Sequence, residues 1–144
     1  MTRKPKLPTP IRPKRGQRHK PKPRNFKDAA KRAWIRTLPC AATFAQSYRA
    51  FYVHGDKAVL RWVARLASAM DGQPGPTECA HVGRRGLGQK SSDKETIPLS
   101  DVEHRIGPYS WHKLGPTKFQ EHWNLDVNRL AAALHAAFEE QRGK

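Results

Sequence analysis

The sequence predicts an α+β fold in which two short strands and a following helix are surrounded by further helices and preceded by a basic arm. Three observations predict it. Apolar residues recur at helical spacing over much of the chain after residue 25, two short runs between residues 76 and 100 are typical of strands, and a proline-rich basic segment precedes both. At 144 residues the chain is long enough for one core and too short for two comfortable ones.

The composition favours a polyanionic partner. The formal net charge is +16, from 28 Lys and Arg against 12 Asp and Glu, and each cation placed on a phosphate releases condensed counterions. Nucleic acid is therefore the expected partner. No apolar run approaches the roughly 20 residues of a membrane-spanning helix, and no apolar segment follows the N-terminal charges as in a signal peptide. We expect no membrane association and a cytoplasmic location, in a cell without organelles or wherever the DNA is.

Two cysteines, Cys40 and Cys79, are too few for a disulfide framework or for a four-cysteine zinc site. Ligation of an ion by cysteine together with histidine stays open.

Residues 1–24 are expected to form a disordered basic arm. Lys and Arg alternate there with Pro and no acid is present, so the segment cannot bury enough apolar surface to offset its ordering entropy. We interpret it as a partly polyproline-II arm that binds nucleic acid without sequence preference. A solubilising tail and a targeting sequence are the alternatives.

Residues 25–75 are expected to form a helical scaffold. Asn25 can cap a first helix that Pro39 stops. Residues 41–53 fit either one helical face or a strand, whereas residues 56–70 carry a clear apolar stripe at helical spacing. The Gly and Pro residues of 72–76 break the chain, and we place there the boundary to a second unit, residues 76–144.

The second unit opens with the expected strands, residues 77–82 and 96–99, and Pro98 suits an edge strand. Ser100 is then expected to cap a helix that carries His104 and ends at Gly107. Further along, we expect a short helix opened by Pro116 and ended near Asn124, and a last helix capped by Asp126.

Histidines are the candidates for chemistry. His81 lies on the first strand, where a neutral imidazole can take a proton from water, although a single strand histidine is more often structural. Two strands followed by a helix can bring His81 and His104 to opposite sides of one scissile phosphate, one as base and one as metal ligand. His112 can approach the same place only if the chain turns back. His122 and His135 are expected to be structural or on the surface.

The loop between the strands is expected to contact phosphate. It is rich in glycine, which lets a backbone approach closely, and Arg84, Arg85 and Lys90 supply charged donors. A mobile solvated loop is the alternative. Tyr109 and Trp111 fit base stacking or packing beneath the site equally well.

The order of the strand histidine, the glycine-rich basic loop and the later histidines resembles that of the small HNH (His-Me finger) nucleases of phages and prophages, including the RecA-dependent phage nuclease group. The resemblance covers about residues 76–126. It is carried by the runs Ala80–Gly83, Gly86–Asp93, Thr96–Leu99, Glu103–Arg105 and Tyr109–Gly115. It implies a ββα-metal core, a phage or prophage origin with a bacterial host cell, and a recombinase as a possible partner.

The resemblance also implies roles for single residues. His81 would be the general base, and His104 a metal ligand on the helix. His112 would join the metal or contact the phosphate, and Asp93 would stand near a middle polar residue that we assign to the metal. One divalent ion, Mg²⁺, Mn²⁺ or Zn²⁺, would stabilise charge on the leaving 3′ oxygen. The expected nucleic-acid-binding residues are Arg84, Arg85, Lys90 and Lys113.

The chain departs from this family at Ala80, where many relatives have a His or Asp ligand, and at Ser100 and Glu103, where relatives often have cysteines. The zinc knuckle is therefore expected to be lost and replaced by an apolar core built from the helical segment. Three hypotheses remain: a metal-dependent HNH endonuclease acting on DNA, a non-catalytic DNA- or RNA-binding accessory protein with a degenerate site, and a ribosome-like structural protein. The last is based on charge alone and has no need for the histidine spacing.

Overall fold

Six helices and one antiparallel hairpin make up the described part of the chain, which in this computed structural model is residue 2 and residues 27–70, 75–83 and 92–143. This confirms the α+β class. The elements, in order, are α1 (Ala29–Thr37), α2 (Ala45–His54), α3 (Ala58–Ala69), β1 (Thr77–His81), β2 (Thr96–Ser100), the π-helix η1 (Val102–Ile106), α4 (Trp111–Trp123) and α5 (Val127–Arg142).

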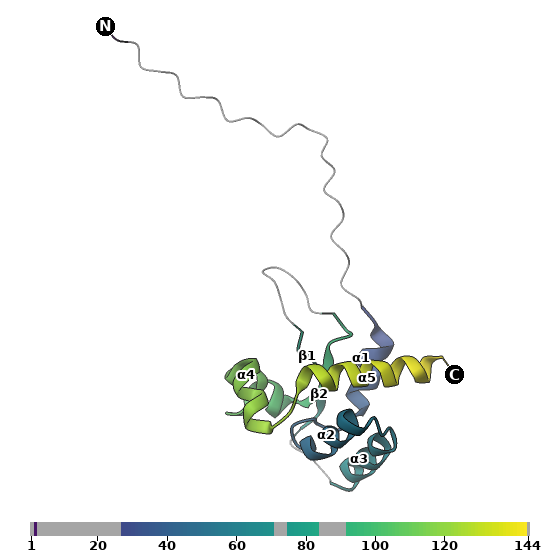
Figure 1. The fold of residues 1–144 in the computed structure, drawn as a ribbon. Helices are drawn as coiled ribbons and strands as arrows, with labels where there is room; N and C mark the ends of the chain where they lie inside the picture. The colour runs from purple at the N-terminus through teal and green to yellow at the C-terminus, as the bar shows by residue number, and fades with distance from the viewer. Residues whose placement is uncertain (1, 3–26, 71–74, 84–91, 144) are drawn as a thin grey trace.

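The helices enclose the hairpin. Helix α1 packs on both strands and α5 packs on β2 and α2, while α3 packs on α2 (Figure 1). Helix α4 lies at one end of α5 and contacts η1. Within the described residues, no helix has the length and apolar character needed to cross a membrane. The predicted arm, apart from residue 2, lies outside the described residues.

Helix α1 begins later than predicted, and the expected Asn25 cap is wrong. The cap is Asp28, whose backbone is extended and whose carboxylate accepts the Lys31 N–H at 3.1 Å. An extended Asp28 prevents the helix from continuing back to Asn25. Leu38 is the C-cap, so the helix ends before Pro39 as predicted.

Residues 41–53, which fit one helical face or a strand, provide all but the last residue of helix α2. Tyr48 and Phe51 lie on one buried face, and the Tyr48 hydroxyl donates to the Pro39 carbonyl at 2.7 Å. Gly55 ends the helix in a left-handed conformation at φ 67°. The hydroxyl contact fixes α2 against the turn that follows α1.

The two strands pair in antiparallel register, with Thr77 opposite Ser100 and His81 opposite Thr96. Pro98 lies on β2 without an N–H to donate, and its carbonyl accepts the Ala41 N–H at 2.7 Å on the outer edge. All five residues of β2 are buried. Strand β2 is therefore fully covered, whereas in β1 only Ala80 is buried and the other four residues are partly exposed.

The helix after β2 differs from the expectation. Asp101, and not Ser100, is its cap, and the element is a single π-type turn closed by the Gly107 N–H on the Val102 carbonyl at 2.7 Å. The Ser100 hydroxyl still accepts the Glu103 N–H, at 3.2 Å. A side chain at Gly107 would meet the Val102 carbonyl at 2.9 Å, so glycine permits this tight closure.

Helix α4 begins earlier than predicted, at Trp111 with Ser110 as its cap. Gly115, at φ 77°, interrupts it, and Pro116 opens the second part. The predicted start at Pro116 is thus correct only for the second part. Asn124 ends α4 and Asp126 caps α5, and both of these predictions are confirmed.

One apolar core spans the molecule. It contains residues from the predicted helical scaffold and from the unit that follows it, including Ile35, Tyr48, Val63, Ile97 and Leu130. The predicted boundary at residues 72–76 falls mostly outside the described residues. The described residues 41–70 therefore share one core with the hairpin that carries the candidate site.

Candidate functional site

His81, the last residue of β1, is paired with a buried carboxylate. Its Nε2 lies 2.7 Å from Oδ1 of Asp93, and Asp93 is fully buried. Thr96 donates its hydroxyl to the Asp93 carbonyl at 3.1 Å, which fixes the turn before β2. The pair is therefore held by both strands of the hairpin.

Helix α1 supplies the other contacts of Asp93. Oδ2 accepts the Asp28 N–H at 2.7 Å, and Arg32 Nε lies 3.5 Å away. Burial alone would raise the pKa of Asp93, but the Asp28 N–H, the His81 contact and Arg32 outweigh it and lower the pKa. Asp93 is therefore ionised at neutral pH, and the His81 nitrogen that faces it carries a proton.

A buried lysine stands beside this pair. Lys31 on α1 is fully buried and donates Nζ to the Lys94 carbonyl at 3.1 Å. Burial lowers its pKa to about 8, against the opposing effect of Cys79, Asp93 and other acidic groups. Lys31 thus fixes the residue after Asp93 and adds positive charge near the carboxylate.

A second histidine group lies between β1, η1 and α4. His104 Nδ1 is 2.7 Å from Glu78 Oε2, and Arg105 also pairs with Glu78. Burial would raise the pKa of Glu78, but its hydrogen bonds with His104 and Arg105 lower it. Burial, followed by the charges of His112 and Arg105, lowers the pKa of His104 despite the Glu78 contact. His104 is thus neutral at pH 7 and donates Nδ1–H to Glu78.

His112 completes this group. The chain turns back after η1, so that His112 Nε2 lies 3.1 Å from His104 Nε2 and the ring centroids are 4.7 Å apart. Since the His104 proton is on Nδ1, His104 Nε2 accepts and His112 Nε2 donates. Two ring nitrogens therefore share one proton at the place where they converge.

The converging nitrogens fit a divalent ion in part. Nitrogen ligands about 2.0–2.1 Å from one ion lie roughly 3.0–3.4 Å apart, and the observed separation is 3.1 Å. Glu78 behind His104 is the carboxylate that commonly orients a metal-bound histidine. Within the described residues no group of three or more His, Cys, Asp or Glu side chains is arranged for a metal, so these residues offer two ligands, His104 and His112.

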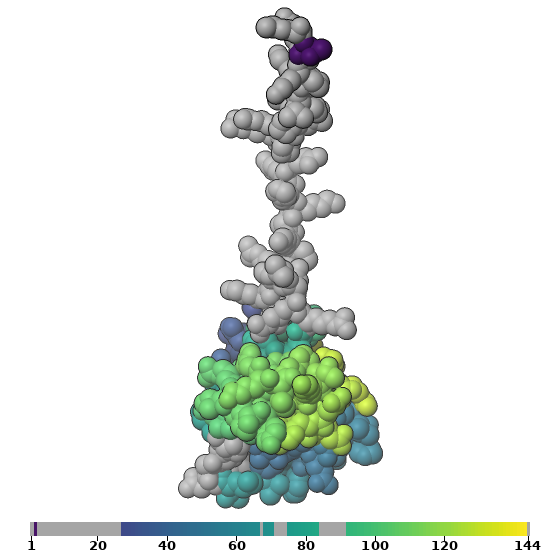
Figure 2. Space-filling model, turned by 90° about the vertical axis from the view of Figure 1, so that its left-hand side faces the viewer, coloured from purple at the N-terminus to yellow at the C-terminus, as the bar shows by residue number. Residues whose placement is uncertain are grey.

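One cavity connects the two histidine groups. It has a volume of about 490 Å³ and is bordered by His81 and His112, with residues of the α4–α5 region forming much of its wall. Figure 2 faces α4 and shows it beside the first turns of α5 on one side of the molecule. His104 does not border this cavity but reaches it through its contact with His112.

The predicted site residues are therefore divided between two groups. The structure places Asp93 with His81 and not in a ligand group with His104 and His112. Lys113 donates Nζ to the Ile106 carbonyl at 2.7 Å and is otherwise exposed. The predicted phosphate contacts Arg84, Arg85 and Lys90 lie outside the described residues.

Sequence reasoning missed the side chains that hold the histidines. None of Glu78, Asp28 and Arg32 is among the predicted site residues. Strand alternation places Glu78 opposite His81, but nothing in the sequence indicates that η1 covers that face. Ala80, the position of the missing ligand, is fully buried in the core.

The aromatic candidates have different roles. Trp111 is 9% exposed and packs edge-on against Phe119, so packing beneath the site is the role the structure supports. Tyr109 is 50% exposed and stacks on His122 with centroids 4.1 Å apart. Tyr109 remains accessible to a base.

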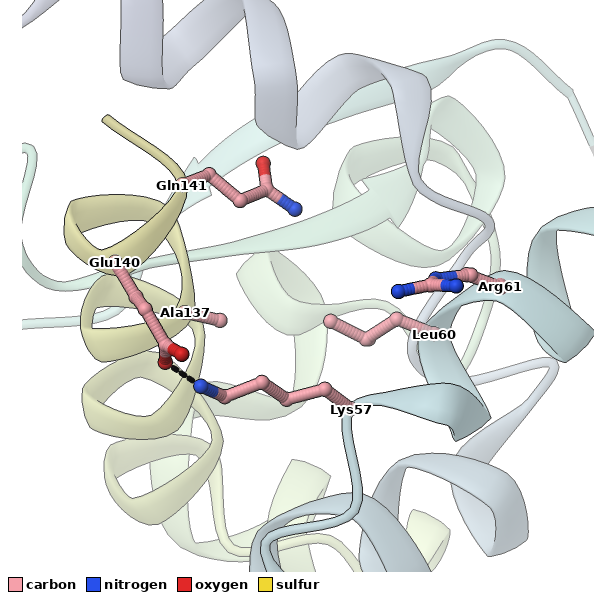
Figure 3. A pocket seen from close by; sticks show the side chains of 6 residues that line it. All are labelled: Lys57, Leu60, Arg61, Ala137, Glu140 and Gln141. Carbon is pink, nitrogen blue, oxygen red and sulfur yellow. Dashed lines mark ion pairs between the residues drawn. The ribbon is translucent and has the colours of Figure 1, made fainter. Parts of the chain in front are cut away.

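A smaller pocket of about 100 Å³ lies between α3 and α5. Figure 3 shows Lys57 and Glu140 joined by an ion pair across it, with Leu60 and Ala137 beneath. Lys57 and Glu140 neutralise each other and link α3 to α5, and Arg61 is the remaining charged residue at its border. We assign this pocket to the scaffold.

No protein-family model, curated protein or solved structure matches this chain. The resemblance to HNH nucleases therefore stays a prediction, and the function is inferred from the site.

Acid should destabilise the fold through Asp93. Its pKa is lowered in the folded protein, so the unfolded chain binds the proton first. The stabilisation is complete well above 3.8, the ordinary value, begins to fall there, and is lost as pH falls further through the lowered pKa of the folded protein. Replacing Asp93 with Asn should lower the free energy of unfolding at pH 7 by about 1–3 kcal/mol. Urea unfolding at several pH values should show this deficit shrinking as pH falls below 4.

Glu121→Gln, a change at an exposed acid of α4, serves as the control and should change stability by less than about 0.5 kcal/mol. A deficit of Asp93→Asn that stays constant down to pH 3 would contradict the assigned role of the carboxylate.

Proposed function

We propose that this protein is a metal-dependent endonuclease that hydrolyses phosphodiester bonds in DNA by an HNH-type, one-metal mechanism on a ββα-metal core. The main support is the cavity bordered by both His81 and His112. It places a carboxylate-held histidine and a pair of converging histidines next to one space. A base and an ion site on either side of a phosphate are what hydrolysis requires.

His81 acts as the general base. Because ionised Asp93 accepts the proton of Nε2, the neutral ring keeps its free lone pair on Nδ1. This nitrogen takes the proton from the attacking water. Asp93, held by Asp28 and Arg32, fixes the tautomer and stabilises the imidazolium that forms.

In the ion-bound protein the Nε2 atoms of His104 and His112 would hold the ion, and the proton that His112 Nε2 otherwise donates to His104 would then be on Nδ1 of His112. When bound, the ion supplies a positive charge for the phosphate and for the leaving 3′ oxygen. Glu78 keeps the His104 proton on Nδ1, so that Nε2 remains a ligand. Because burial lowers the pKa of His104, protons compete weakly for it at neutral pH.

Most of the positive charge lies outside the described residues. Those from 27 onward hold 14 Lys and Arg and 11 Asp and Glu, a net charge of +3. Residues 1–26 hold 10 Lys and Arg and no acid. We infer that the arm supplies most of the sequence-independent affinity for DNA, while the body formed by the helices and the hairpin supplies the chemistry.

A non-catalytic DNA- or RNA-binding accessory protein is the second candidate. Two observations favour it: Ala80 is buried where a ligand is expected, and the described residues offer only paired ring nitrogens for an ion. This candidate needs the basic arm but not the His81–Asp93 pair. The two candidates differ in whether plasmid is nicked.

His81→Ala should abolish nicking of supercoiled plasmid in Mg²⁺, Mn²⁺ or Zn²⁺. Loss of a general base typically costs about 10²–10⁴-fold in rate. DNA affinity, measured by gel shift in EDTA, should stay within a few-fold because the charge is elsewhere. His54→Ala, a change at an exposed histidine at the end of α2, is the control and should nick normally.

Nicking that persists unchanged in His81→Ala would exclude the assigned base. Plasmid left intact by the wild-type protein with every ion, beside a clear gel shift, would favour the non-catalytic binder.

The arm should dominate the salt dependence of DNA binding. Replacing all ten Lys and Arg of residues 1–26 with Gln should weaken binding and flatten the slope of log K against log salt. The magnitude of this slope should decrease by about 0.7–0.9 for each phosphate that the variant no longer neutralises. The matched control replaces Arg61, Arg65 and Lys118, three exposed cations of the body, with Gln. Equal slopes for the two variants would place the DNA contacts on the body instead.

A further inference from the structure

Away from His81 and His112, the described walls of the cavity suit a weakly polar group better than a phosphate. Of the ten described residues that border it, none is Lys, Arg, Asp or Glu. A phosphate oxygen is usually bound by cationic side chains or by several free N–H groups. The part of the wall that the described residues form is therefore uncharged apart from the two histidines at its edge.

The walls combine apolar and neutral polar surfaces. Val82, Trp111, Pro116 and Val127 contribute apolar atoms. Trp111 is fixed by its edge-on contact with Phe119, whose ring centroid is 5.3 Å away. A rigid apolar wall of this kind suits a flat, weakly polar group such as a nucleobase.

Two polar side chains at the cavity are available to a ligand. Neither the Thr117 hydroxyl nor the Asn128 amide makes a hydrogen bond to another described residue, and both residues are exposed. Gln120 is different, because its amide donates to the Pro116 carbonyl and accepts the Val127 N–H, both at 3.1 Å. Gln120 braces the wall between α4 and α5, and Thr117 and Asn128 are left to bind.

We propose that this cavity binds one nucleobase of the DNA strand, next to the bond that is hydrolysed by the water that His81 activates. The inference rests on the proposed function, since it takes DNA as the ligand. The apolar wall contacts the face of the base, and Thr117 and Asn128 hydrogen-bond to its edge. An Asn side chain can pair with an adenine through two hydrogen bonds, so these two residues determine which base is preferred at this position.

The volume supports a ligand of this size. About 490 Å³ lies within the range of roughly 300–1,000 Å³ typical of small-molecule sites, and it exceeds what a water molecule or a single ion requires. The base has to leave its stack to enter, which is easiest in single-stranded or opened DNA.

The test compares two end-labelled single-stranded oligonucleotides of equal length in EDTA, so that no cleavage occurs. One carries normal bases and the other is abasic throughout, so both have the same backbone charge. The full-length protein should bind the first about tenfold more tightly, in line with the effect of removing one stacked base. Fluorescence anisotropy at fixed salt measures the ratio of the two affinities.

Thr117→Leu and Asn128→Ala should each lower this ratio at least threefold without changing affinity for the abasic strand. Gln46→Ala removes an exposed amide on α2, away from the cavity, and should leave the ratio unchanged. Tyr109→Ala tests the exposed Tyr109–His122 stack as the competing place for a base. Thermal unfolding of each variant shows whether the fold is kept.

A wild-type ratio of one would overturn the inference, as would a ratio lowered by Tyr109→Ala and not by the cavity variants. The plasmid nicking assay is run on the same preparations. A ratio that depends on Thr117 and Asn128 without any nicking would support the base site while the endonuclease proposal fails. Nicking with a ratio of one would leave the endonuclease proposal standing without the base site.

Discussion

The buried carboxylate of Asp93 is the constraint on which the candidate site depends. An ionised carboxylate removed from water costs several kcal/mol unless both oxygens are satisfied. One oxygen faces His81, and the other receives the Asp28 N–H, with Arg32 nearby. Arg142 of α5 pairs with Asp28 in turn. The first helix, the hairpin and the last helix are thus joined around one negative charge, and His81 is fixed as a result.

The division of the site into two histidine groups follows from the strand. Glu78 and His81 are three residues apart on β1, so their side chains leave opposite faces of the hairpin. Helix α1 packs on the hairpin and contributes Asp28 and Arg32 to the His81 group, while η1 contributes His104 to the Glu78 group. After η1 the chain turns back, so that His112 lies next to His104 and borders the same cavity as His81. The short helix η1 and the turn after it therefore bring His104 and His112 together, although the two residues do not lie on one continuous helix.

Local patterns in the sequence were sufficient to predict the helices and strands, but they did not predict the contacts between them. The helix predicted from the apolar stripe of residues 56–70, the strand-like runs and the Asp126 cap depend on neighbours within a few positions, and these elements are found in the structure. Of the stripe itself, Val63 is buried, whereas Trp62 and Met70 are exposed. Asp28 and Asp93 are 65 positions apart, and Glu78 and His104 are 26 apart. Such pairs form because α1 and η1 pack on the hairpin, and a local sequence pattern does not predict that packing. The π-type turn was missed because its closure depends on the tight approach at Gly107.

The central claim is that the Nε2 atoms of His104 and His112 receive one ion beside a base held by Asp93. Magnetic resonance of the histidine ring nitrogens, with substoichiometric Mn²⁺ added to the full-length protein, tests it directly, because the paramagnetic ion broadens only nearby signals. Broadening should be strongest for His104 and His112, weaker for His81, and absent for exposed His54. Signals of His104 and His112 that stay sharp, or that broaden no more than His54, would contradict the account.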